Sequence, residues 1–269
     1  MAKFSRIEWT DHTFNPWWGC ARVSPACDNC YAEAIARRFS AGIWGARAPR
    51  RFFGEAHWRE PLRWNAEAVR LGARKRVFCA SMADVFENRA EVVAHRSKLW
   101  ELIRATPALD WLLLTKRPQL IARYLPQDWG GGYSNVWLGT TTENQTEAQR
   151  RVPHLLGTPS VVHFISAEPL LSALDVRDWL ISAPGRGKIG WVIAGGESGA
   201  RARPSDPAWF RGLRDDCKRA GVPFHFKQWG NWAPSKSGTL AKVSKAVAGR
   251  RLDGRIWNGL PSEAFAPTE

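Results

Sequence analysis

Short apolar runs recur along the chain, and most of them end in polar residues and precede a helix-like stretch. They lie at residues 76–86, 110–118, 135–145, 161–171, 190–199 and 222–230, and a further strand is expected near FNPWWGC, residues 14–20. Continuous apolar runs with such bounds are typical of strands that are buried on both faces. Their alternation with helical stretches indicates about seven repeated β/α units.

This alternation predicts an α/β fold whose parallel strands form a (β/α) barrel, full or partial and TIM-like. An open doubly wound sheet is the alternative, but the G-x-G-x-x-G turn that usually follows its first strand is absent from the sequence. We expect residues 1–230 to form one barrel domain with a basic, Trp-rich insertion at about 40–64. Residues 231–269 are expected to form a basic extension that packs on the barrel.

Polar residues follow nearly every predicted strand. In (β/α) barrels the carboxyl ends of the strands form the active site, so these residues are expected to share one rim. The candidates are Ser81, Asp84, Lys116, Thr140, Glu143, Asn144, Glu168, Gly195, Gly196, Glu197 and Lys227. A single residue such as Asp84 could be a helix N-cap, but capping does not explain six strands that end in this way.

The charge and the aromatic content favour a nucleic-acid partner. The formal net charge is +14, and the chain contains 16 tryptophans. Basic residues contact phosphates, and aromatic rings among them can stack on exposed bases. The alternative is that tryptophan fills the core and arginine covers the surface. The candidate contacts lie in the insertion: Arg47, Arg50, Arg51, Trp58 and Trp64.

The sequence also predicts a cytoplasmic protein with no membrane partner. The N-terminus has no apolar segment typical of a signal peptide, and no apolar run approaches the roughly 18 to 20 residues of a membrane span. Five cysteines, an odd number with three of them clustered, argue against a secreted disulfide framework.

Three of these cysteines, Cys20, Cys27 and Cys30, form a C-x6-C-x2-C pattern within eleven residues. Cys79 and Cys217 lie far away and are expected to be small buried apolar residues. Thiolates bind zinc or iron–sulfur clusters, and the spacing alone leaves both open. The cysteine loop is expected to follow the first strand, at the rim, which favours a metal centre with an open coordination position.

These cysteines and a series of motifs resemble the radical S-adenosylmethionine superfamily. More closely, the chain resembles the phage- and bacterium-associated "three-Cys-motif" family of radical-SAM-like proteins. The matching stretches run in order from residue 7 to residue 261: IEWTDHTFNPWWGCARVSPACDNCYAE, SMADVF, LLTKRP, VWLGTTTENQ, ISAEPLL, WVIAGGESG, AGVPFHFKQWG and RRLDGRIWNGLP. The chain departs from the superfamily's C-x3-C-x2-C spacing. Asn29 stands where an aromatic residue usually precedes the last cysteine, and Tyr31 follows it.

The resemblance implies that the three clustered cysteines ligate a 4Fe–4S cluster whose open iron binds S-adenosylmethionine. Reductive cleavage would then give a 5′-deoxyadenosyl radical that removes a hydrogen from the substrate. The expected cofactor contacts are Tyr31; Ser81 and Asp84 at the methionine end; Thr140, Glu143 and Asn144 at the ribose; and Gly195 and Gly196. The catalytic candidates are Glu168, Glu197, Lys116 and Lys227.

Taken with the net charge, the resemblance predicts a radical enzyme that modifies bases or repairs lesions in nucleic acid, with DNA favoured over RNA. A reductant such as flavodoxin or ferredoxin is the implied partner. Two alternatives stay open. One is a non-catalytic nucleic-acid-binding protein with a zinc or structural iron–sulfur site, and the other is a radical enzyme with a small-molecule substrate.

Overall fold

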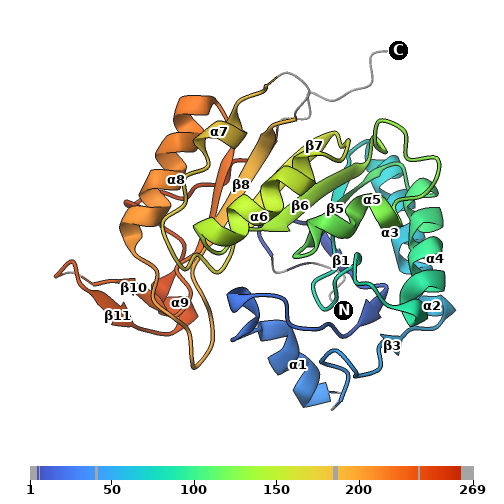
Figure 1. Ribbon diagram of the computed structural model, residues 1–269, viewed down its shortest axis with the longest axis horizontal. Helices are drawn as coiled ribbons and strands as arrows, with labels where there is room; N and C mark the ends of the chain where they lie inside the picture. The colour runs from blue at the N-terminus through green and yellow to red at the C-terminus, as the bar shows by residue number, and fades with distance from the viewer. Residues whose placement is uncertain (1–4, 6, 40–41, 184–186, 236, 262–269) are drawn as a thin grey trace. The chain divides into compact units, whose positions relative to one another are not determined.

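The computed structural model in Figure 1 describes residues 5, 7–39, 42–183, 187–235 and 237–261. The chain divides into two compact units, each made of three segments. The first unit consists of Met1–Val23, Ala32–Gly139 and Thr158–Val161, and the second of Ser24–Tyr31, Thr140–Gly157 and Val162–Glu269.

The fold is mixed α/β and contains a seven-stranded parallel sheet with the strand order β1-β4-β5-β6-β7-β8-β9. Each strand lies within or beside a predicted apolar run, so the expected α/β alternation with parallel strands is confirmed. The strands are β1 (His12–Phe14), β4 (Lys75–Cys79), β5 (Leu109–Thr115), β6 (Val136–Thr141), β7 (Val162–Ala167), β8 (Ile189–Gly195) and β9 (Phe224–Gln228).

In the first unit, β4 pairs in parallel with β1 on one side and with β5 on the other. The core of this unit is aromatic: the rings of Phe14 and Trp111 meet edge-on at 5.7 Å. The remaining elements are α1 (Tyr31–Phe39, whose first residue belongs to the second unit), β2 (Trp17–Trp18), β3 (Arg51–Phe52), α2 (Glu55–Trp58), α3 (Glu60–Leu71), η2 (Ala90–Val92), α4 (Val93–Arg104), η3 (Pro118–Leu120) and α5 (Ile121–Tyr124).

In the second unit, β8 pairs in parallel with β7 and β9. The other elements are η1 (Pro25–Cys27), α6 (Gln145–Leu156), α7 (Arg177–Leu180), α8 (Pro207–Ala220), β10 (Trp232–Pro234), β11 (Leu240–Lys242) and α9 (Lys245–Ala248). Helices α7 and α8 lie side by side, and α9 lies against β10 (Figure 1). Asp206 caps α8 by accepting a hydrogen bond from the N–H of Ala208 at 2.8 Å, and Gly221 ends the helix at a φ of 66°.

The C-terminal extension contacts the strands of the second unit. The N–H of Phe226 donates to the carbonyl of Trp257 at 3.0 Å, and the indole N–H of Trp191 donates to the carbonyl of Gly259 at 2.8 Å. Residues far beyond the last sheet strand therefore supply hydrogen-bond partners to β9 and β8.

Nine of the 16 tryptophans are buried, so the core accounts for much of this unusual content. Cys79 and Cys217 have no exposed surface, which confirms them as buried apolar residues. Burial raises the pKa of the Cys217 thiol to about 12 and raises that of Cys79 as well. Within the described residues, no helix combines the length and the apolar character needed to cross a membrane.

Candidate functional site

The clustered cysteines are divided between the two units. Cys20 belongs to the first unit, whereas Cys27 and Cys30 belong to the second. All three are half-buried and are thiols rather than disulfides. The surroundings of Cys20 and those of the pair are therefore distinct environments, each built from its own unit.

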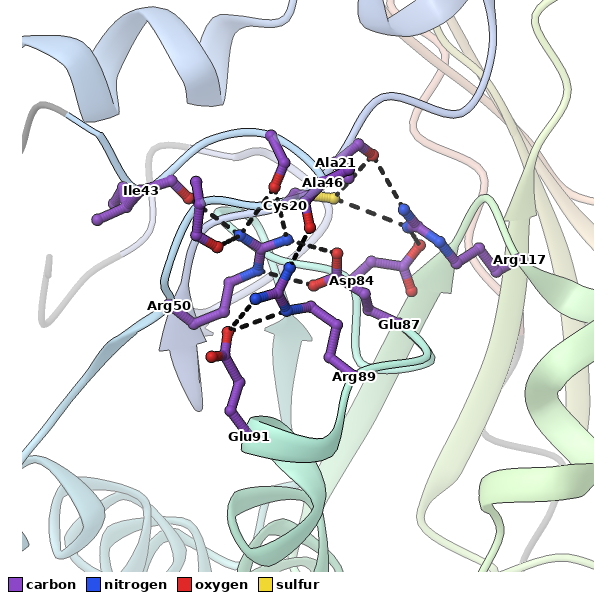
Figure 2. Close-up of polar contacts among 12 residues, drawn as sticks. Cys20, Ala21, Ile43, Ala46, Arg50, Asp84, Glu87, Arg89, Glu91 and Arg117 are labelled. Carbon is purple, nitrogen blue, oxygen red and sulfur yellow. Dashed lines mark hydrogen bonds and ion pairs between the residues drawn. The ribbon is translucent and has the colours of Figure 1, made fainter.

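In the first unit, a guanidinium group lies against Cys20. Arg117, two residues after the end of β5, places Nη1 3.7 Å from Cys20 Sγ and 2.8 Å from Asp84 Oδ2, and its Nη2 donates to the carbonyl of Ala21 at 2.9 Å (Figure 2). The hydroxyl of Thr115 donates to Asp84 Oδ1 at 2.7 Å. Both oxygens of the buried Asp84 are thus engaged, and this carboxylate orients Arg117 toward the thiol.

The charges in this cluster act on the thiol in opposite directions. Burial, and after it the carboxylate of Asp84, raise the pKa of Cys20, whereas Arg117 lowers it, and the net result is a pKa of about 12. Burial also disfavours the charged form of Arg117, but Asp84 and Cys20 together raise the pKa of that guanidinium above its ordinary value. Arg117 therefore stays cationic and is the group that favours a thiolate at Cys20.

A second buried ion pair shapes the loop beside Cys20. Arg50 and Glu87 form a bidentate pair, with Nε–Oε2 at 2.8 Å and Nη2–Oε1 at 2.5 Å, and the Arg50 side chain has no exposed surface. Nη1 of Arg50 donates to the carbonyls of Ala48 at 2.8 Å and Ile43 at 3.3 Å (Figure 2). Glu87 thus orients Arg50, and Arg50 in turn donates hydrogen bonds to the carbonyls of the loop.

The same loop is joined to the cysteine by its backbone. The N–H of Gly45 donates to the carbonyl of Cys20 at 2.8 Å. Gly19 has a φ of 115°, and a Cβ there would lie 2.4 Å from the carbonyl oxygen of Ile43. Only glycine at this position lets the loop approach the residue before the cysteine so closely.

Three of the five expected nucleic-acid contacts are buried in the first unit: Arg50, Trp58 and Trp64. Trp58 meets Phe14 edge-on at 5.4 Å, Trp64 stacks on His12 at 4.4 Å, and Arg50 serves the ion pair described above. Each of the three is packed against partners inside the unit, so their contact with nucleic acid stays a prediction that this burial does not support. Two are exposed: Arg47 and Arg51.

In the second unit, carboxylates bind the segment that carries the other two cysteines. Glu143 has no exposed surface, and its Oε2 lies 2.7 Å from Nη1 of the buried Arg151. Its Oε1 accepts a hydrogen bond from the N–H of Ala26 at 3.3 Å, one residue before Cys27. Glu143 was expected at the ribose of a cofactor; in the structure it holds the main chain of the cysteine segment instead.

A second carboxylate, Glu197, holds the same segment. It accepts hydrogen bonds from Asn29 Nδ2 at 3.0 Å and from the backbone N–H, Nε and Nη2 of Arg203 at 2.8, 2.9 and 2.6 Å. Arg203 also donates to the carbonyl of Pro25 at 2.9 Å and lies 3.3 Å from Asp28. Burial acts to raise the pKa of Glu197, but the hydrogen bonds from Arg203 and Asn29 outweigh it and lower that pKa. The carboxylate thus stays ionised and fixes the residue before the last cysteine.

A third charged pair lies at the strand ends of the second unit. Lys227 Nζ is 3.3 Å from each carboxylate oxygen of Glu168, and both side chains are mostly buried. A Cβ on Gly195 would lie 2.4 Å from Glu168 Oε1, and one on Gly196 would lie 1.9 Å from the carbonyl oxygen of Trp229. The two glycines, expected to let the backbone approach a cofactor, are needed here for packing inside the protein.

The remaining rim candidates of the first unit are half-buried. The hydroxyl of Ser81 accepts a hydrogen bond from Asn15 Nδ2 at 3.1 Å. The N–H of Lys116 donates to Asp84 Oδ2 at 3.2 Å. Both residues therefore belong to the hydrogen-bonded network at the end of β4 and β5.

The remaining candidates of the second unit differ in exposure. Thr140 is fully buried. Asn144 caps α6 by accepting a hydrogen bond from the N–H of Glu147 at 2.9 Å, which gives it a structural role. Tyr31, next to Cys30, is 51% exposed and is the candidate cofactor contact most accessible to a ligand.

Sequence reasoning missed three members of these ion pairs: Glu87, which pairs with Arg50, and Arg151 and Arg203, which pair with Glu143 and Glu197. Arg203 stands six residues after Glu197, a spacing that matches no regular helix or strand neighbour. Arg151 lies on α6, eight residues after Glu143, and a single sequence carries no signal that would pair them. Only the folded backbone brings each arginine to its carboxylate.

In the described ranges, no three side chains of the Cys, His, Asp and Glu types are grouped so that they could hold a metal ion. The donor set itself is three thiols within eleven residues, and thiolates are the ligands of iron–sulfur and zinc centres. A cation beside Cys20 and a main chain fixed around Cys27 and Cys30 suit a segment that carries negative ligands. By the chemistry of its donors alone, the segment suits an iron–sulfur or a zinc centre.

The chain was compared with protein families, curated proteins and solved structures. The model of a family described as a protein of unknown function, DUF5131, matches residues 4–261, which include the whole cysteine segment. No curated protein and no solved structure matches the chain.

Proposed function

We propose that this chain, which belongs to the DUF5131 family of unknown function, is a radical-SAM-type enzyme that acts on nucleic acid. One observation carries the proposal: in each unit, ion pairs with at least one buried member hold the segment that carries the clustered cysteines or the loop bonded to it. Burying an ion pair costs desolvation free energy. Three of these pairs contact residues 20–30 directly, and the fourth, Arg50–Glu87, holds the loop whose Gly45 donates to the carbonyl of Cys20. This concentration is best explained by a need to fix the cysteine segment.

Cys20, Cys27 and Cys30 would hold the 4Fe–4S cluster, and Tyr31, which is 51% exposed, would contact the adenine of S-adenosylmethionine. When bound, the cluster and S-adenosylmethionine supply one-electron reductive cleavage and hydrogen abstraction. Arg117 offsets negative charge at Cys20. A reductant such as flavodoxin or ferredoxin belongs to the proposal.

The charged residues of the second unit would orient the substrate and the cysteine segment. Glu168 and Lys227 form an ion pair at the strand ends, where they would orient a bound substrate. Glu143 and Glu197 keep the cysteine segment in one conformation through Ala26 and Asn29. The proposal includes the architecture of a partial (β/α) barrel whose cysteine segment follows its first strand.

The nucleic-acid part of the proposal is supported by charge. The chain carries a formal net charge of +14, and Arg47 and Arg51 of the insertion are exposed. Polyanions gain affinity for such a surface through the release of counterions, so binding should weaken steeply with salt. DNA is favoured over RNA as the substrate.

The test is anaerobic reconstitution with iron and sulfide, followed by metal analysis and electron paramagnetic resonance of the reduced protein. We expect roughly four irons per chain and a reduced-cluster signal that shifts when S-adenosylmethionine is added. Replacing any one of Cys20, Cys27 or Cys30 by Ser should abolish iron retention. The matched control is Cys217→Ala, which removes a buried thiol outside the segment and should keep the iron.

Other outcomes would redirect the proposal. A cluster whose signal is unchanged by S-adenosylmethionine would indicate a structural iron–sulfur site. Zinc in place of iron after anaerobic purification would overturn the radical chemistry and support the alternative of a non-catalytic metal-containing protein that binds nucleic acid.

A further inference from the structure

A hollow of about 520 Å³ lies in the second unit, where the C-terminal extension folds beside α8. Its walls come from α8, from the hairpin formed by β10 and β11, from α9 and from the turn that follows α9. In Figure 1 these elements lie together at one end of the unit. Nothing in the proposed radical chemistry uses this hollow.

The walls of the hollow combine apolar side chains with charged ones. The apolar side chains include Ala233, Ala241, Val243 and the 74% exposed Val247, and the charged ones are Arg211, Arg251 and Asp253. An apolar concave surface of this size with a few polar groups is typical of a site for a small planar or aliphatic group.

The charge around the hollow favours an anionic ligand. Arg211 is paired with Asp253 at 2.9 Å, whereas Arg251 donates to the carbonyl of Gly254 at 2.9 Å. In the portion of the chain that the structure describes, no carboxylate pairs with Arg251. Residues 231–261 contain six Lys or Arg and one Asp, so the positive charge is not offset within the extension.

The hollow is attached to the segment that holds the cysteine loop. The N–H of Asn231 donates to the carbonyl of Glu197 at 2.9 Å, and the indole N–H of Trp232 donates to the carbonyl of Ala202 at 2.7 Å. The carboxylate of Glu197 binds Asn29 of the cysteine loop. One segment, residues 197–203, therefore supports both the hollow and the loop.

We propose that this hollow binds one nucleotide of a single-stranded nucleic acid, with the base against the apolar walls and the phosphate at Arg251. The inference rests on the proposed function and names the place where its substrate is held. A base can enter a concave site only when it is out of the duplex stack, so single strands should bind in preference to duplexes. A guanidinium binds a phosphate by two parallel hydrogen bonds, which a purely aliphatic ligand could not use.

The test is fluorescence anisotropy of a labelled single-stranded DNA of roughly 12 nucleotides with the full-length chain. Arg251→Glu should weaken binding about tenfold and reduce the dependence on salt. Ala241→Trp, which fills the hollow without a change of charge, should weaken binding about as much and leave the salt dependence unchanged. Val247→Asp, at an exposed position that tolerates substitution, places a carboxylate at the mouth and should weaken binding if Ala241→Trp fails to fold.

The matched control is Arg70→Glu, the same charge change at an exposed arginine of α3 in the first unit, and it should alter affinity by less than about twofold. Equal weakening by Arg70→Glu, or wild-type affinity in the hollow variants, would overturn the inference and leave the proposed function standing. A wild-type chain that binds no strand would remove nucleic acid from both. Iron content and the paramagnetic signal judge the radical chemistry separately.

Discussion

The segment at Cys20 and the segment at Cys27 and Cys30 are held in opposite ways. At Cys20 the contacts come from arginines: Arg117 lies 3.7 Å from the sulfur and also donates to the neighbouring carbonyl, while its carboxylate partner stands behind it. At the other two cysteines, carboxylates accept hydrogen bonds from the segment itself. Arg151 stands behind Glu143, whereas Arg203, beside Glu197, also donates to the carbonyl of Pro25, so no arginine of this unit is recorded against a sulfur in the described residues.

This difference separates two tasks. A guanidinium beside a sulfur changes the free energy of the thiolate, because opposite charges a few ångströms apart attract strongly where water is scarce. A carboxylate that accepts from a backbone N–H or from an Asn side chain fixes conformation and does not face the sulfur. The first unit thus controls charge at Cys20, and the second controls the shape of the segment from Ser24 to Cys30.

The largest effect is expected where the pairing is most buried. Glu143→Gln removes the charge that compensates Arg151, whose side chain is 1% exposed, and leaves a buried cation with a weaker partner. We expect a loss of about 3 to 5 kcal/mol in the free energy of unfolding. Urea unfolding followed by circular dichroism measures it.

The control for this prediction is Glu33→Gln, which breaks the exposed i,i+4 pair with Arg37 on α1 and should cost about 0.3 to 0.5 kcal/mol. A loss below about 1 kcal/mol in Glu143→Gln would show that Arg151 is compensated by Glu147, which lies 2.8 Å away. The idea that Glu143 fixes the cysteine segment would then lose its energetic basis.

The strands were predictable because buried parallel strands leave a plain pattern in a sequence. The run DWLLLTKRP became β5, whose residues are nearly all buried, and the run GWVIAGGESG became β8. The polar residues after these runs were also expected, and they do stand at the strand ends. Burial on both faces requires apolar residues at consecutive positions, so this part of the fold can be read locally.

The partners of the charged residues could not be predicted in this way. Arg50 pairs with Glu87, 37 residues later in the sequence. Glu143 accepts a hydrogen bond from the N–H of Ala26, more than a hundred residues earlier. Composition shows that a chain is basic, but it does not show which arginines form buried ion pairs. Arg50, an expected nucleic-acid contact, is buried in such a pair, and the ring of Trp58 packs in the core.

A second experiment removes one of the two arginines, Arg203 or Arg50, at a time. Arg203→Gln removes the guanidinium that supports Glu197 and binds the carbonyl of Pro25, so the amides of residues 24–30 should exchange hydrogen about tenfold faster. Arg50→Gln should do the same to residues 42–50. Hydrogen exchange read by mass spectrometry measures both segments in each variant.

Each variant serves as the control for the other. We expect Arg203→Gln to speed exchange in residues 24–30 and to leave residues 42–50 unchanged, and we expect the reverse in Arg50→Gln. This result would show that the two segments are held independently. If hydrogen exchange becomes faster in both segments of either variant, the separation of tasks between the units is wrong. The two sets of ion pairs would then stabilise one cooperative structure.

The smallest effect is a pH dependence confined to the second unit. Hydrogen bonds from Arg203 and Asn29 overcome burial and hold the pKa of Glu197 below the ordinary 4.5 of a glutamate. Its ionised form is therefore favoured by folding, so its contribution to stability is complete above pH 4.5 and is lost as the pH falls through the folded-state pKa. The difference in urea midpoint between wild type and Glu197→Gln should be constant near neutral pH and shrink in acid.

Arg203 is one-third exposed, so solvent screening keeps the effect modest. In an Arg203→Gln background the same comparison should lose most of its pH dependence, and a difference that grows in acid would mean that burial rather than hydrogen bonding controls Glu197.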